Sequence, residues 1–113
     1  MNFGLKPVIL VLLQEENSYG YKIMQRIEEE FGFEEINPGS VYRALRQMDK
    51  EGLCESEWEM PSQEGGPARR MYSITDDGEA YLEAWAGACK QYREVMDSFA
   101  RVYRSSTPHS FEQ

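Results

Sequence analysis

A heptad repeat of apolar residues runs through the C-terminal third of the sequence. The spacing alternates between three and four residues, which keeps one face of an α-helix apolar along its length. Thr75 can cap this helix, and a helix from Asp76 to Arg104 would be roughly 43 Å long at about 1.5 Å per residue. The apolar seam consists of Leu82, Trp85, Cys89, Tyr92, Met96, Phe99 and Tyr103.

This apolar seam limits what the rest of the chain can be. With 113 residues, of which 41% are hydrophobic, the chain can build one modest core. Such a core cannot cover an apolar stripe of that length, and an exposed stripe promotes aggregation. We therefore expect a homodimer in which the seam residues of two copies form the interface.

Upstream of the seam, the sequence predicts three short helices and a hairpin. Apolar residues at intervals of three and four predict helices over residues 5–15, 18–31 and 38–51. Apolar and polar residues then alternate over 53–60, and a second strand is predicted over 68–74. The glycine- and proline-rich residues between these strands should form the tip of the hairpin.

The second helix has signals at both ends. Ser18 is a suitable N-cap, and Gly32 can take the left-handed conformation that ends a helix. Gly20 costs up to about 1 kcal/mol relative to alanine in a helix, so we expect close packing there. The predicted inner stripe of this helix consists of Tyr21, Met24, Ile27 and Phe31.

The third helix has end signals and a basic outer face. Pro38 suits a first turn, Asn37 or Ser40 can cap the helix, and Gly52 can end it. The inner face carries Val41, Ala44, Leu45 and Met48. The residues on or near the outer face are Ser40, Arg43, Arg46, Gln47 and Lys50.

The order of three helices, a hairpin and a long helix is typical of a winged helix-turn-helix fold. We predict a mainly α protein with a small β-hairpin (α+β). Residues 1–74 would form the winged helix-turn-helix DNA-binding domain, residues 75–104 the C-terminal dimerisation helix, and residues 105–113 a disordered tail.

Four short segments can be compared with known families. They are Gly20-Tyr21, Pro38-Gly39-Ser40-Val41-Tyr42 with Leu45, Glu51-Gly52-Leu53, and Tyr72-Ser73-Ile74-Thr75-Asp76-Asp77-Gly78. In this order and spacing they resemble the PadR family of transcriptional regulators, with coverage from about Leu5 to Tyr103. The single C-terminal helix is similar to that of the compact branch of the family. Arg43 departs from the pattern, because many relatives carry proline after the tyrosine.

The resemblance implies a repressor that binds a roughly palindromic DNA operator as a homodimer. The third helix would enter the major groove, and the hairpin would contact the flanking backbone or minor groove. Ser40 and Tyr42 match the family motif and are expected DNA contacts. Helix geometry adds Arg43, Arg46, Gln47 and Lys50, since arginine can pair with guanine and lysine can neutralise phosphate.

Two arginines on the second strand add a further basic site. Because side chains alternate along a strand, either Arg69 or Arg70 should point toward DNA, while the other pairs with a glutamate of the hairpin or packs. The net charge of −8 favours an alternative, a winged-helix protein-interaction module without DNA binding. The local basic sites keep DNA binding as the preferred hypothesis.

The aromatic residues of the seam suggest an effector site. In some PadR relatives a small, often aromatic, ligand near the dimer interface releases the DNA. Trp85 and Tyr92 are therefore candidate ligand-binding residues, although packing in a core or interface is the preferred interpretation. Trp58, on the hairpin, is expected to pack against the helices.

Catalysis and metal binding are not expected. The sequence contains no arrangement of His, Ser and Asp for nucleophilic catalysis and no glycine-rich phosphate loop after a strand. Cys54 and Cys89 lack the spacing of a metal site and should be reduced thiols. The apolar run from Val8 to Leu13 is too short for a signal sequence or a membrane span. We expect a cytoplasmic protein without cofactor, metal or membrane contact.

Overall fold

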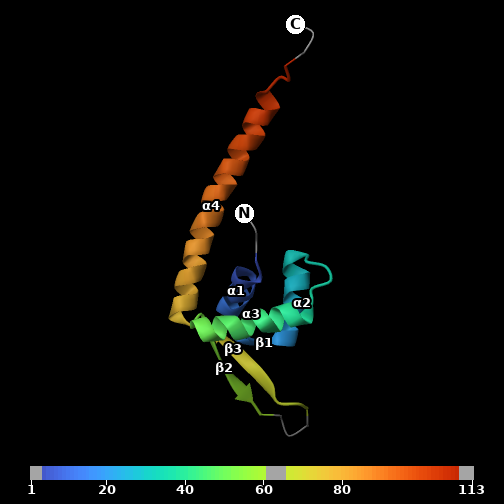
Figure 1. Cartoon of the computed structure of the whole chain (residues 1–113), viewed down its shortest axis with the longest axis vertical. Helices are drawn as coiled ribbons and strands as arrows, with labels where there is room; N and C mark the ends of the chain where they lie inside the picture. Colours follow the sequence, from blue (N-terminus) through green and yellow to red (C-terminus); the bar gives the residue numbers. More distant parts are fainter. Residues whose placement is uncertain (1–3, 61–65, 110–113) are drawn as a thin grey trace.

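A long helix projects from a head of three helices and a small sheet (Figure 1). The computed structural model describes residues 4–60 and 66–109, so part of the predicted hairpin tip and the end of the predicted tail lie outside the described residues. The molecule measures 79 × 29 × 20 Å along its principal axes. Its helices are α1 (Leu5–Glu15), α2 (Gly20–Phe31), α3 (Pro38–Glu51) and α4 (Asp76–Ser105).

The ends of α2 and α3 follow the predicted signals. Gly32, with φ of 66°, ends α2, and Gly52, with φ of 80°, ends α3. Of the two candidate caps for α3, Asn37 is the one used, because its Oδ1 accepts a hydrogen bond from the backbone N–H of Gly39 at 2.8 Å. Pro38 occupies the first turn, as predicted.

The sheet has three strands rather than the two of a simple hairpin. The strands are β1 (Ser18–Tyr19), β2 (Cys54–Glu59) and β3 (Arg69–Ile74), all antiparallel in the order β1-β3-β2. The hairpin of β2 and β3, called the wing below, was predicted. The strand β1 was not, because two residues are too few to show an alternating pattern.

The prediction that Ser18 caps α2 is wrong. Ser18 pairs with Tyr72 in the sheet, and its side chain is buried, with no hydrogen-bond partner for Oγ within the described ranges. Tyr19 occupies the N-cap position of α2, and its side chain makes no capping hydrogen bond. Pairing with β3 therefore fixes the start of α2 where a capping side chain was expected.

The core lies between α1, α2, α3 and the inner face of the sheet. In α2 it contains Ile23 and Ile27, whereas Tyr21 is 59% exposed and Phe31 is 38% exposed. The predicted inner stripe of α2 was thus shifted around the helix. The buried hydrophobic residues are Val8, Ile9, Leu10, Leu12, Leu13, Ile23, Ile27, Val41, Leu45, Met48, Cys54 and Tyr72.

Gly20 is closely packed, as its position near the start of α2 suggested. A Cβ atom added there would lie under 3.0 Å from Tyr42 Cε1, so the ring of Tyr42 lies directly against the backbone of α2. Any larger residue would displace this ring. The start of α2 and the first turns of α3 are therefore held together by a contact that needs glycine.

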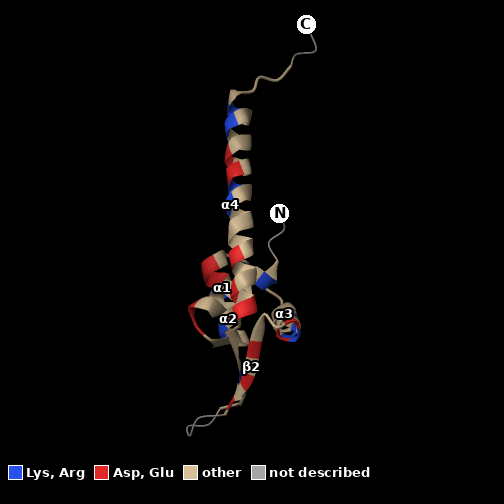
Figure 2. Ribbon diagram, turned by 90° about the vertical axis from the view of Figure 1, so that its left-hand side faces the viewer, with Lys and Arg blue, Asp and Glu red and all other residues tan. Residues whose placement is uncertain are grey.

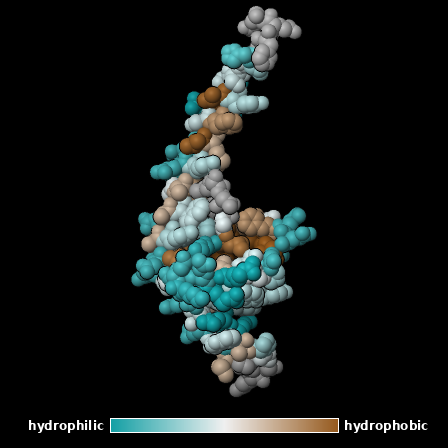
Figure 3. Space-filling view, in the orientation of Figure 1, coloured by the Kyte–Doolittle hydropathy of each residue, from teal (hydrophilic) through white to brown (hydrophobic). Residues whose placement is uncertain are grey.

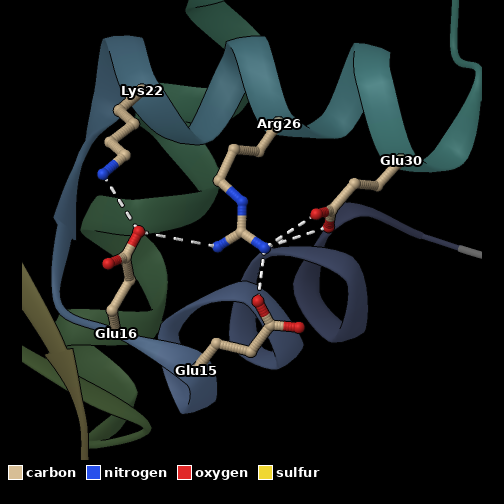
Figure 4. A network of polar contacts seen from close by, with 5 residues as sticks. All are labelled: Glu15, Glu16, Lys22, Arg26 and Glu30. Atoms are coloured by element: carbon tan, nitrogen blue, oxygen red, sulfur yellow. Dashed lines mark hydrogen bonds and ion pairs between the residues drawn. The ribbon is translucent and has the colours of Figure 1, made fainter.

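A five-residue ionic network joins the end of α1 to α2 (Figure 4). The Arg26 guanidinium pairs with Glu15 and, at 2.9 Å, with Glu30, while Lys22 pairs with Glu16 at 3.0 Å. Hydrogen bonds to Glu30 and Glu15 raise the pKa of Arg26, and the hydrogen bond from Lys22 lowers the pKa of Glu16. The network therefore links the end of α1 and the residue after it to one face of α2.

The first turns of α4 are anchored to the head, and its second half is not. Thr75 Oγ1 accepts a hydrogen bond from the backbone N–H of Gly78 at 3.1 Å, and Tyr81 and Leu82 pack against the core. Further along, Val95 is 63% exposed and Phe99 is 70% exposed. No helix within residues 4–60 and 66–109 is long and apolar enough to cross a membrane.

Candidate nucleic-acid interface

An outer row of polar side chains follows the exposed face of α3. The row consists of Ser40, Arg43, Gln47 and Lys50, at intervals of three and four residues. Arg43, Gln47 and Lys50 are exposed, and Arg43 Nη2 donates a hydrogen bond to Ser40 Oγ at 3.2 Å. The structure thus brings together four of the predicted contact residues on one accessible strip.

A second row on α3 faces the wing. It consists of Tyr42, Arg46 and Asp49, and we call it the wing-side row. Tyr42 packs on Gly20 and remains 39% exposed, so it can both support α2 and present its hydroxyl. Arg46 lies close enough to Tyr72 of β3 for its charge to act on the pKa of the phenol.

An open groove of about 700 Å³ separates α3 and the start of α2 from the wing. Its walls combine aromatic rings with guanidinium groups, a combination suited to contact with a phosphate backbone and sugars. The side chains that line it include Tyr19, Tyr21, Tyr42, Arg46, Trp58, Arg69 and Arg70. Both predicted wing arginines therefore lie on the same groove as the wing-side row.

The two wing arginines lie on opposite faces of β3 and have different partners. Arg69 lies over the ring of Tyr19, with 4.0 Å between Cζ and the ring centroid, and its Nη2 is 3.5 Å from Glu59 Oε1. Arg70 instead points toward α3 and donates from Nε to Ser56 Oγ at 2.7 Å. The two residues are thus not interchangeable, as the alternation of the strand indicated.

The charge of this surface is mixed (Figure 2). Arg46, Arg69 and Arg70 line the groove, whereas the exposed side of β2 carries Glu55, Glu57 and Glu59. These acids account for part of the net charge of −8 without occupying the outer row of α3. The basic character is therefore local, as the sequence suggested.

Trp58 does not pack against the helices, contrary to the prediction. Its side chain is 62% exposed on the wing, and the Arg70 guanidinium lies 5.7 Å from its ring centroid. The reason is geometric, because the wing leaves the head after Cys54 and no helix lies beside its outer part (Figure 1). Trp58 thus belongs to the groove and not to the core.

Cys54 is an inert structural thiol. It is buried, its Sγ is 3.8 Å from the carbonyl oxygen of Leu45, and burial raises its pKa to about 11. Burial also raises the pKa of the neighbouring Tyr72. Cys54 and Cys89 are both free, and no group of metal-binding side chains occurs within the part of the chain that the structure describes.

The apolar seam of α4 divides into two parts. Leu82, Trp85 and Cys89 are half-buried against α1, whereas the remaining seam residues are exposed. Figure 3 shows hydrophobic surface both on the head beside α4 and along the projecting part of α4. The exposed seam residues are Tyr92 at 43%, Met96 at 52%, Phe99 at 70% and Tyr103 at 70%.

A second groove of about 680 Å³ lies between α1 and α4. Trp85 lines it and donates from Nε1 to the Tyr81 hydroxyl at 2.9 Å. Val8, Val11, Leu82 and Cys89 are also among the lining residues, and Tyr92 is not. Of the two candidate ligand-binding residues, Trp85 is therefore the one that lines this groove.

The three-helix head, the wing and the accessible outer row of α3 define a winged helix-turn-helix protein of the kind that regulates transcription. The family model for the transcriptional regulator PadR-like family matches residues 9–84, and the chain belongs to this family. The family consists of transcriptional regulators and not of enzymes, in agreement with the sequence analysis.

Solved structures show the same fold. A PadR family transcription regulator from Clostridium difficile is 27% identical, with a TM-score of 0.75, and the match covers 84% of this chain and 96% of that chain. Bacillus subtilis PadR in complex with operator DNA is 30% identical, with a TM-score of 0.65, over 73% of this chain and 46% of that one.

A curated relative agrees with these matches. A probable transcriptional regulator from Mycobacterium tuberculosis is 33% identical over 83 residues, which cover 73% of this chain and 43% of the relative. The chain thus spans less than half of this relative and of Bacillus subtilis PadR.

Proposed function

We propose that the protein is a repressor that binds a roughly palindromic DNA operator as a homodimer. The observation that carries this proposal is the outer row of α3, which is accessible, polar and basic and lies beside the wing. An α-helix of this kind fits the major groove of B-DNA, where base edges can be distinguished. The operator complex of Bacillus subtilis PadR supports the same use of the fold.

Each residue type on α3 has a suitable task at DNA. Arg43 and Arg46 can donate paired hydrogen bonds to guanine or bind phosphate, and Gln47 can pair with adenine. Lys50 is suited to neutralising phosphate, and Tyr42 can donate its hydroxyl to the backbone. Ser40 lies at the start of α3, where the backbone approaches phosphate first.

The exposed half of α4 supports dimerisation. An apolar stripe that is 43–70% exposed at its aromatic and methionine positions is unfavourable in water, and a second copy would cover it. A twofold dimer would place two α3 helices on one face, with half-sites separated by about one helical turn of DNA, roughly 34–36 Å.

An effector site near the dimer interface is a further part of the proposal. The groove beside Trp85 has apolar walls and one indole ring that could stack on a planar ligand. Tyr92 lies two turns further along α4 and is not among the lining residues, and a partner subunit could bring its own Tyr92 to this groove. A planar aromatic compound bound here would act on the dimer and hence on the spacing of the α3 helices.

The acidic surface favours one alternative, a winged-helix module that binds a protein partner and not DNA. Glu55, Glu57 and Glu59 form an exposed acidic strip on the wing, which would repel a phosphate backbone that came close. The two functions differ in their response to salt. DNA binding weakens steeply as salt increases, because counterions are released when phosphates are neutralised.

Electrophoretic mobility shifts with the DNA upstream of the protein's own gene test the proposal. We expect a specific complex that weakens about tenfold or more in Arg43→Ala, Arg46→Ala protein, since each arginine pair with a base contributes on the order of 1–3 kcal/mol. The matched control is Lys90→Ala, Arg101→Ala, which removes the same charge from the exposed surface of α4. Equal weakening in both variants, or no specific complex at low salt, would contradict the proposal.

A further inference from the structure

A polar network connects the wing to α3 at the point where the wing leaves the head. Ser56 Oγ donates a hydrogen bond to Asp49 Oδ2 at 2.6 Å and accepts one from Arg70 Nε at 2.7 Å. Arg70 Nη2 lies 3.8 Å from the same carboxylate oxygen. Three residues from α3, β2 and β3 are therefore joined through a single hydroxyl.

The network lies at the base of the wing, where a small change of angle moves the outer part of the wing. On β2, Cys54 is buried in the core, Ser56 is half-buried and Trp58 is 62% exposed. Ser56 is thus the last inward-facing residue of β2 before the strand becomes exposed. A change of angle at Ser56 displaces each later residue of β2 in proportion to its distance from Ser56, which increases by about 3.3 Å per residue.

Arg69 provides a contrast on the other face of the same strand. Its ion pair with Glu59 lies within the wing, between two side chains that are each 47% exposed. Such an exposed pair is weak and can exchange its carboxylate for a phosphate. Arg70 is exposed to a similar degree, 45%, but its Nε donates a charge-assisted hydrogen bond to Ser56 Oγ, which in turn donates to Asp49, so releasing Arg70 would break a connected network.

We propose that Asp49, Ser56 and Arg70 form a clamp that fixes the wing relative to α3. Arg70 is then a positioning residue, whereas Arg69, which lies over the ring of Tyr19 and beside Glu59, is not part of the clamp. This inference rests on the proposed function for its consequence at DNA, although the clamp itself is a property of the free protein. The clamp sets the separation between the wing and the outer row of α3. This separation determines which DNA shapes the wing and α3 can contact at the same time.

The clamp and the alternative, in which Arg70 itself contacts phosphate, predict changes of DNA affinity in opposite directions. If Arg70 contacts phosphate and the network merely withholds it, then Ser56→Ala releases the guanidinium and binding becomes tighter. If the network positions the wing, Ser56→Ala loosens the wing and binding becomes weaker. Ser56→Thr keeps the hydroxyl in a strand that accommodates threonine well, so it serves as the matched control.

The first experiment measures the affinity of the protein for the DNA upstream of its own gene as a function of salt concentration. The clamp predicts that Ser56→Ala, which removes both hydrogen bonds of the Ser56 hydroxyl, weakens specific binding about fivefold or more, with an unchanged slope of log affinity against log salt. Ser56→Thr should bind DNA as tightly as the wild type does. Arg70→Gln should have the same slope of log affinity against log salt as the wild type. Tighter binding by Ser56→Ala, or a slope that falls by about one unit in Arg70→Gln, would overturn the proposal.

The second experiment needs no DNA and separates the clamp from the proposed function. Hydrogen exchange of the β2 and β3 amides should be faster in Ser56→Ala and Asp49→Ala than in the wild type, and unchanged in Ser56→Thr. If exchange rises as expected and no form of the protein binds DNA, the clamp stands and the proposed function fails. If exchange in Ser56→Ala equals that of the wild type, the clamp is refuted.

Discussion

Two glycines in α4 should respond in opposite directions to replacement by alanine. Gly87 lies mid-helix, and a methyl group added there would have no other atom within 4 Å, so Gly87→Ala gains only helix propensity. We expect the free energy of unfolding to rise by about 0.5–1 kcal/mol. Gly78 lies in the first turn, where an added Cβ would be under 3.0 Å from the carbonyl oxygen of Leu53.

The cost at Gly78 follows from what that carbonyl does. Leu53 O accepts a hydrogen bond from the backbone N–H of Thr75 at 3.2 Å, and Thr75 Oγ1 also donates to Gly52 O at 2.6 Å. A methyl group must push this backbone away, which costs about 1–3 kcal/mol for overpacking and about 1 kcal/mol for the weakened bond. Gly78→Ala should therefore lower the free energy of unfolding by about 2–4 kcal/mol.

Urea unfolding followed by far-ultraviolet circular dichroism measures both effects. The two variants must be compared at one protein concentration, because the stability of a dimer depends on it. A Gly78→Ala protein as stable as Gly87→Ala would refute the close contact between α4 and the turn after α3.

Three other predictions concern the seam, the buried thiol and the wing. Phe99→Glu should give a monomer or a weakened dimer in sedimentation equilibrium, whereas Arg101→Glu should remain dimeric; a tight Phe99→Glu dimer would contradict the interface. Burial raises the pKa of Cys54 to about 11, so the folded state keeps the thiol proton that the unfolded state loses near pH 9. The free energy of unfolding should therefore fall as the pH rises from about 9 to about 11. Urea unfolding at about pH 8 and at alkaline pH should show this loss in the wild type and less of it in Cys54→Val. In a Trp85→Phe background, acrylamide should quench Trp58 emission readily, and strong protection would contradict an exposed wing indole.

Much of the fold could be predicted because its signals are local. The glycines that end α2 and α3, the Asn37 cap and the Thr75 cap each act within a few residues, and the sequence shows them directly. The long seam of α4 was also visible, since its spacing continues over several turns.

The sequence-based predictions were wrong at residues whose position depends on tertiary contacts. Ser18 looked like a cap, but pairing with Tyr72 draws it into the sheet as β1. Tyr21 was expected in the core, yet it lines the groove because Gly20 and Ile23 occupy the buried side of α2. Neither outcome depends on local spacing, so the residues themselves carried no signal of it.

The candidate site was only partly visible in the sequence. The outer row of α3 followed from helical spacing, and the structure places these residues together. The roles of Asp49 and Ser56 were missed, because a hydroxyl that joins an acid on α3 to an arginine on β3 depends on the angle between a helix and a hairpin. The sequence showed only an acid on the third helix, a serine on the first strand of the hairpin and an arginine on the second. Such residues are common on any protein surface.

The most direct test of the central claim is the affinity of the protein for the DNA upstream of its own gene and for a scrambled duplex of the same composition, measured between about 50 and 200 mM salt. We predict tighter binding to the upstream sequence throughout, and a linear fall of log affinity with log salt for both. Equal affinity for the two sequences, or binding that does not change with salt, would contradict a sequence-specific DNA-binding regulator.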